Sequence, residues 1–249
     1  EAELQVFPDV LSESSGVAQG HQDPTVFYTQ QDEGHTADLY LFSLDGNVIG
    51  VQSMKGATNT DWEDLSIGPC PDSINAESCI YAGDIGDNTE VRSTVGVWVA
   101  PESMESSVDA IWCPLVYPKG KHYDSEAMFV DSTGIVRIIT KSSDGISRVF
   151  RAPDLRCSSA PQELVEEVEL PIEGATADDR QITGAGSSPD GSQVVLRSKT
   201  TAWIYDGCYL DWNHPRLTLT LPEQIKGEGI TISDLGELIS TSENDPTQS

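Results

Sequence analysis

Short apolar runs alternate with polar turns along the whole chain. Runs rich in Val, Ile, Tyr, Phe and Thr are bounded by Gly, Asp and Pro roughly every 8 to 12 residues. Helical periodicity is absent apart from an ambiguous stretch at Gln162–Leu170. The pattern predicts an all-β protein made of repeated four-stranded units.

A small signature introduces the first strand of each unit. Aligning its copies at Gly16, Asp64, Ala127, Gly184 and Gly229 gives spacings of 48, 63, 57 and 45 residues, the length range of a propeller blade. Three of the copies also carry a glutamate. The sequence therefore predicts a β-propeller of five four-stranded blades, with six as the alternative if the long second unit contains an extra blade.

We expect residues 1–249 to form one domain, since propellers of this length commonly do. The last unit is short, and a propeller must close its ring. Leu4–Phe7 lies just before the first signature and is predicted to be the outer strand of the last blade. The expected blades are approximately 14–56, 61–118, 124–171, 181–222, and 227–249 together with 1–10.

The charge is strongly acidic, with 41 Asp and Glu against 14 Lys and Arg and a formal net charge of −27. Such a surface repels nucleic acid and anionic membranes and favours divalent cations, high salt or basic partners. Solubility adaptation in a secreted or halotolerant organism would produce the same composition. No apolar run approaches the roughly 18 residues of a membrane span.

Two observations indicate a secreted or extracellular protein, with the periplasm or cell surface as alternatives. The first residue is glutamate, which is typical of a chain whose signal peptide has been removed. Cys70 and Cys79 flank a short loop between predicted strands and form a plausible disulfide, and Cys113, Cys157 and Cys208 leave one further pair open.

The candidate site follows from the architecture. In a propeller, the innermost strand of each blade begins on the face where the second strand ends, so both loop families converge on one rim. Crowded carboxylates there need a cation, and calcium, with six to eight oxygen ligands, fits best. The predicted metal ligands are Asp32, Glu63, Asp64, Asp84, Asp87, Asn88, Glu126 and Glu228, and Asp61, Asp124, Asp178, Asp179, Thr183 and Glu243 are expected on the same rim.

Each group has a structural alternative. The Ala82–Asn88 segment could be a turn stabilised by its own side chains without an ion. Glu126 and Glu228 could accept hydrogen bonds from inner-strand amides. Lys141 and Arg197 end the second strands of their blades and either neutralise the carboxylates or bind an anionic substrate group such as phosphate.

Other catalytic signatures are weak. The four histidines have no metal-ligand spacing, and the chain contains no Gly-x-Ser-x-Gly elbow and no phosphate-binding Gly-rich loop. If the protein is an enzyme, the candidate catalytic residues are Glu126, Lys141 and Arg197.

The ordered motifs resemble a family of secreted bacterial β-propeller proteins of largely unassigned function, similar in style to phytase-like and NHL/gluconolactonase-like propellers. In the phytase-like proteins, rim carboxylates hold calcium ions that bridge substrate phosphates, and Lys and Arg assist; the resemblance implies such roles for the rim residues named above. The motifs are Asp61-Trp62-Glu63-Asp64-Leu65, Gly83-Asp84-Ile85-Gly86-Asp87-Asn88, Asp124-Ser125-Glu126-Ala127, Ile182-Thr183-Gly184-Ala185 and Gly227-Glu228-Gly229-Ile230.

Two functions are therefore expected from the sequence. The first is an extracellular calcium-binding propeller that acts as a binding or assembly module for a small molecule, a glycan or phosphate ligand, or a protein partner. The second is a calcium-dependent hydrolase of phosphoesters or lactones, in which the cation polarises the substrate and Lys141 and Arg197 stabilise negative charge.

Overall fold

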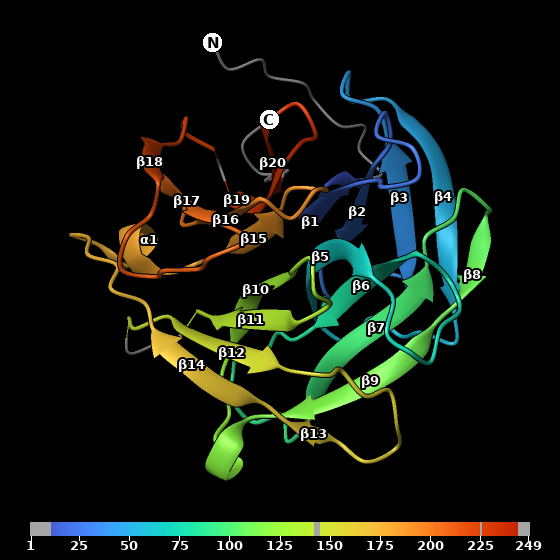
Figure 1. The fold of residues 1–249 in the computed structure, drawn as a ribbon, viewed down its shortest axis with the longest axis horizontal. Helices are drawn as coiled ribbons and strands as arrows, with labels where there is room; N and C mark the ends of the chain where they lie inside the picture. The colour runs from blue at the N-terminus through green and yellow to red at the C-terminus, as the bar shows by residue number, and fades with distance from the viewer. Residues whose placement is uncertain (1–10, 142–144, 225, 244–249) are drawn as a thin grey trace.

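The apolar runs form antiparallel strands in the structure, a computed structural model that describes residues 11–141, 145–224 and 226–243. The sheets are arranged around a common axis as a β-propeller (Figure 1). The described chain contains little helix, including the 3₁₀ turn Pro118–Gly120 and α1 (Ala177–Arg180). The all-β propeller prediction is confirmed.

The described residues contain four blades, each a sheet of four or five strands. From the inside outward, the first blade contains β1 (Ser14–Gln19), β2 (Phe27–Gln31), β3 (Asp38–Phe42), β4 (Val48–Lys55) and β8 (Ser107–Asp109), and the second contains β5 (Trp62–Pro69), β6 (Ser78–Asp84), β7 (Val95–Pro101), β9 (Ile111–Val116) and β13 (Gln162–Glu163). The third blade contains β10 (Ser125–Val130), β11 (Val136–Thr140), β12 (Arg148–Ala152) and β14 (Val165–Glu169). The fourth contains β15 (Gly184–Ser187), β16 (Gln193–Arg197), β17 (Thr201–Asp206) and β18 (Leu217–Thr220).

The count of four blades differs from the predicted five, and from the alternative of six. After the fourth blade, β19 (Lys226–Ile232) and β20 (Leu238–Glu243) form a sheet of only two strands, because the described part of the last unit is long enough for one hairpin. β19 packs against both β15 and β1, so the five innermost strands still surround the axis. The expected closing strand Leu4–Phe7 lies outside the described residues.

Two short strands cross from one sequence unit to the preceding blade. β8 follows β7 in the chain but pairs in parallel with the end of β4, and β13 pairs in parallel with β9. Each therefore covers part of an outer strand whose N–H and C=O groups would otherwise be unpaired. The sequence pattern predicts blades from consecutive segments and does not reveal this exchange of strands.

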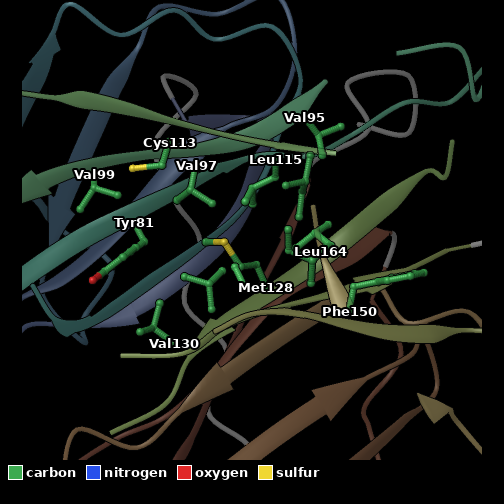
Figure 2. Close-up of a cluster of buried hydrophobic side chains, with 14 of the residues drawn as sticks. Tyr81, Val95, Val97, Val99, Cys113, Leu115, Met128, Val130, Phe150 and Leu164 are labelled. Atoms are coloured by element: carbon green, nitrogen blue, oxygen red, sulfur yellow. The ribbon is translucent and has the colours of Figure 1, made fainter. Parts of the chain in front are cut away.

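The core lies between neighbouring blades. Figure 2 shows Val97 and Leu115 of the second blade against Met128 and Phe150 of the third, all fully buried. The Cys113–Cys157 disulfide joins the same two units, and Cys70–Cys79 forms as predicted, whereas Cys208 is free and exposed. Inner strands such as β5 and β10 are buried along almost their whole length because other strands contact them on both faces.

Candidate metal site at the propeller rim

The repeated signature forms a β-bulge at the start of the inner strands. In β5 the pairing register shifts between Trp62 and Asp64, so Glu63 is the extra residue. Glu126 has the same place in β10, and a register shift in β19 includes Glu228. Because a bulge interrupts the normal alternation of side chains, it can redirect a side chain out of the sheet. The three signature glutamates thus occupy equivalent irregular positions on the rim.

The bulges bring five carboxylates together, which we call the rim acidic cluster. Oxygen atoms of Asp32, Asp61 and Glu63 lie within 4.8 Å of one another, and so do oxygen atoms of Glu63, Asp124 and Glu126. All but Asp32, which is partly buried, are buried side chains. Glu63 and Glu126 lie at the starts of β5 and β10, Asp61 and Asp124 directly precede these strands, and Asp32 directly follows β2, so the two loop families converge as the topology predicts.

The proximity and burial of the carboxylates disfavour their charged forms. Burial and then the charge of Asp32 raise the pKa of Asp61 to about 7. Burial likewise raises the pKa of Glu126 to about 7, although Lys141 opposes the shift. The pKa of Glu63 lies well above its ordinary value because of burial and the charge of Glu126. Bringing these groups together as anions therefore costs free energy unless a cation is bound.

Two members of the cluster lack hydrogen-bond donors among the described residues. The Oδ1 atom of Asp61 is buried and accepts no hydrogen bond. The buried Glu63 carboxylate also has no donor in the described part of the chain. Buried carboxylate oxygens are normally satisfied, so oxygens without donors, facing other carboxylates, are chemically suited to coordinate a cation.

Because Gly86 has no side chain, the carboxylates of Asp61 and Glu63 can lie directly against its backbone. A Cβ atom built on Gly86 would overlap the carboxylates of both residues. We expect Gly86→Ala to displace them and to weaken Ca²⁺ binding about tenfold or more, since affinity depends on the number of charged ligands and the geometry of the site. Isothermal titration measures this. Gly50→Ala in β4 is the control, because its φ is not positive and a Cβ atom there would meet only ordinary contacts, at 3.9 Å or more; equal affinities in both variants would contradict the prediction.

The Ala82–Asn88 segment contacts the cluster through Asp124. Asp84 forms an ion pair with Arg92 at 2.6 Å. Asp87 accepts hydrogen bonds from the backbone N–H groups of Val91 and Arg92, and its own N–H donates to Asp124 Oδ1 at 2.9 Å. Asn88 is exposed. The structure therefore places Asp84 and Asp87 in contacts that hold the turn and Asp124, outside the two groups of converging oxygens.

Asp64 lies apart from the cluster, between inner strands. Its Oδ2 atom accepts hydrogen bonds from the N–H groups of Met128 in β10 and Ala185 in β15, at 2.8 and 3.0 Å. Burial raises its pKa well above the ordinary value, while the bonds from these amides oppose that shift. Asp64 thus links three inner strands across the axis.

Glu228 and Lys141 lie beside the cluster. Lys141 donates to Glu126 Oε1 at 2.6 Å; burial alone would lower its pKa, but the charge of Glu126 and this hydrogen bond outweigh burial and raise it. Glu228 is partly buried, and burial together with the charge of Glu126 raises its pKa to about 8. The other expected rim acids form local contacts: Asp178 pairs with Lys199, Asp179 caps α1 through Thr176, and Glu243 pairs with Lys226.

Arg197 is fully buried and has no carboxylate partner among the described residues. Its guanidinium donates to the carbonyl of Ser198 and to the side chains of Gln224 and Ser240. Burial lowers its pKa to about 10, and the charge of Glu228 opposes that shift. The guanidinium therefore remains charged at neutral pH.

Asp61 and Asp124 were expected on the rim from the sequence, but not as metal ligands. Both directly precede an inner-strand signature, at Asp61-Trp62-Glu63 and Asp124-Ser125-Glu126, and this shared offset of two residues was the available signal. Arg92 was missed altogether, because only the folded turn reveals its pairing with Asp84.

A comparison with protein-family models found no match, and a comparison with curated proteins found none either. No described helix has the length and apolar character required to cross a membrane. The resemblance to secreted and phytase-like propellers consequently remains a prediction from the motifs.

Proposed function

We propose that this protein is an extracellular β-propeller module that binds Ca²⁺ at its rim acidic cluster. The observation that carries the proposal is the convergence of five carboxylates, in which Asp61 and Glu63 lack donors among the described residues. The two disulfides suit an oxidising extracellular compartment. The strongly acidic surface favours cations and disfavours nucleic acid.

Ligand chemistry favours calcium over other divalent cations. The cluster contains oxygen ligands alone, without His or Cys among the described members, whereas zinc and copper prefer nitrogen and sulfur. Five carboxylates from three chain segments can accommodate the irregular, oxygen-rich coordination of Ca²⁺ more readily than the strict octahedron of Mg²⁺. Glu63 belongs to both groups of oxygens and is the common ligand in either arrangement.

The contacts of the rim cations favour a binding role over hydrolysis. An enzyme needs a cation that is free to approach the substrate, but Lys141 is held by Glu126. Arg197 is fully buried and bonded to neutral partners. These contacts support a module in which the bound cation orders the rim and presents it to a ligand or partner.

Calorimetric titration of chelator-treated protein with CaCl₂ and with MgCl₂ tests the proposal. We expect saturable Ca²⁺ binding, a higher melting temperature in Ca²⁺, and weaker binding of Mg²⁺. A ligand that binds the folded state and not the unfolded state increases the free energy of unfolding, and the increase grows with the logarithm of the ligand concentration. The absence of both a binding heat and a melting shift with Ca²⁺ would overturn the proposal.

Stability without calcium should fall as the pH rises. The pKa values of Asp61 and Glu126 are raised from 3.8 and 4.5 to about 7, and that of Glu228 from 4.5 to about 8. The folded state therefore binds more protons than the unfolded state, and the stability due to these groups is complete below about pH 4 and is lost as the pH rises through 7 to 8.

Calcium should reverse this trend because it binds the ionised carboxylates. We expect the difference in melting temperature between calcium-loaded and calcium-free protein to widen from about pH 6 to about pH 8.5. Thermal melts at constant ionic strength measure the difference, and melts with Na⁺ alone provide the control. A difference that stays constant with pH would contradict this prediction.

A further inference from the structure

The outer edge of the first blade is only partly covered. β4 is the fourth strand of this blade, and β8 pairs in parallel with its residues 53–55 alone (Figure 1). Among the described residues, no strand pairs with the outer edge of residues 48–52. We call these residues the open edge of β4. Unpaired N–H and C=O groups along a strand are a template for the addition of another strand.

The open edge carries exposed apolar side chains. Ile49 and Val51 are 53% and 47% exposed, and exposure alternates along this part of β4, so both lie on one face of the sheet. Leu44, in the turn before β4, is 49% exposed. Ten large apolar side chains are exposed among the described residues, and these three fall within eight positions of the chain. The edge therefore offers apolar area as well as backbone groups to a second strand.

The residues that usually prevent edge pairing are missing from this stretch. Natural edge strands often carry charged side chains, especially Lys, or Pro. From residue 46 to residue 54 the chain contains no Asp, Glu, Lys, Arg or Pro, although the whole protein has 41 acidic residues. Such an uncharged edge on a highly charged protein is typical of a surface that another strand covers.

The backbone of Val51 points outward from the blade. The N–H of Ser53 donates to Ser106, and the C=O of Lys55 accepts from Ala110, both on the outer side of β4. Between residues 50 and 53, β4 pairs with β3 in regular register. The direction of these groups alternates along an antiparallel strand, so the N–H and C=O of Val51, two residues before Ser53, also point outward.

We propose that the open edge of β4 pairs in antiparallel orientation with the open edge of a second copy of this chain, across a two-fold axis. Two-fold symmetry makes such an interface self-complementary, because the same surface is used on both copies. Ile49 and Val51 of the two copies would then form one apolar face, and β-branched side chains are favourable cross-strand neighbours. This interface goes beyond the proposed function and shares no residue with the rim acidic cluster.

Charge complementarity favours a second copy as the occupant. Asp45 lies just before the open edge and Lys55 just after its end. Antiparallel pairing brings the beginning of one edge beside the end of the other, so each Asp45 comes beside the Lys55 of the other copy. Both side chains are exposed, and neither forms a salt bridge among the described residues. The edge thus matches itself in apolar and in charged positions.

Sedimentation equilibrium of chelator-treated protein tests the proposal independently of calcium. A pair of short strands is a small interface, and interfaces below about 1,200 Å² are typically weak, so the concentration series extends to about 1 mM. The ionic strength is kept at about 0.15 M, where the Debye length of about 8 Å limits repulsion between two copies of charge −27. We expect a reversible monomer–dimer equilibrium. A protein that stays monomeric throughout the series would overturn the proposal.

Val51→Lys tests the location of the interface. The side chain is half exposed, so the variant should fold, and it places two like charges in one small interface. We expect dimerisation to weaken about tenfold or more. Val165→Lys is the matched control, because Val165 is 42% exposed on β14, the outer strand of the third blade. Equal dimerisation of the two variants would contradict the proposal.

A charge exchange tests the antiparallel orientation. Lys55→Asp alone brings acid beside acid, and Asp45→Lys alone brings base beside base, so each variant should dimerise more weakly than the unsubstituted protein. An equimolar mixture of the two variants restores acid–base neighbours at both ends and should associate about tenfold more strongly than either variant alone, since like charges oppose and unlike charges favour cross-strand pairing. A mixture that associates no better than its components would show that the edges do not meet in this orientation.

Discussion

Replacing Glu63 with glutamine should weaken the stabilisation by Ca²⁺ and, at a pH high enough to ionise the rim carboxylates, raise the melting temperature of the calcium-free protein. The side chain belongs to both groups of converging oxygens, has no hydrogen-bond donor among the described residues, and is buried. Without a cation its charge repels Glu126 and Asp32. With a cation it is the ligand common to both groups, so its loss should reduce affinity by about tenfold or more.

The opposite signs of the two effects make the test specific. Removal of one repulsive charge should raise the calcium-free melting temperature by roughly 2–4 °C, the change that about 1 kcal/mol produces in a domain of this size. Thermal melts with and without Ca²⁺ measure both effects. Glu105→Gln is a matched control on an exposed segment. A lower calcium-free melting temperature with Ca²⁺ binding intact would assign Glu63 a purely structural role.

Asp64→Ala should be the most destabilising of these substitutions. Asp64 Oδ2 accepts the N–H groups of Met128 and Ala185, and its side chain is fully buried. Truncation leaves these two amides without their partner on another strand, removes the acceptor of the neighbouring Leu65 N–H, and leaves a gap between three strands. We expect a loss of roughly 2–6 kcal/mol, because each unsatisfied buried donor costs about 1–3 kcal/mol.

The variant Asp64→Asn distinguishes the contribution of hydrogen bonding to stability from that of the negative charge. Its carbonyl oxygen can still accept from one or both amides, so it should be clearly less destabilising than the alanine variant. Chemical denaturation with a two-state fit measures both, and Asp190→Ala, in a surface turn between β15 and β16, provides the control for loss of a carboxylate. Equal stability of the alanine variant and the unsubstituted protein would show that other contacts hold β5, β10 and β15 together.

The sequence predicted the architecture well because the signal is local. Each strand is short, apolar and bounded by turn residues, and the signature at Glu63 and Glu126 recurs at blade spacing. The same signature marks a bulge, which no alternation of apolar and polar residues reveals, since a bulge appears only when the partner strand is known. The rim was therefore predicted, whereas the directions of its side chains were not.

The sequence alone does not distinguish the roles of neighbouring acidic residues. Glu63 and Asp64 are adjacent, yet one faces the acidic cluster and the other accepts amides of two distant strands. The difference depends on contacts more than 60 residues away along the chain, such as the 64-residue separation between Asp64 and Met128. The prediction of blade number was wrong because the last signature predicts a whole blade, whereas the described residues that follow it form a sheet of two strands.

The crossing strands β8 and β13 have a consequence for modularity. The second and third sequence units each complete part of the sheet of the unit before them, so neither can be deleted without leaving an outer strand of the preceding blade uncovered. A solenoid tolerates such edits because each of its repeats contacts only its neighbours and exchanges no strand with them. In this propeller the repeats are interlocked, and changes in their number during evolution would have to carry the connecting segments along with the blades.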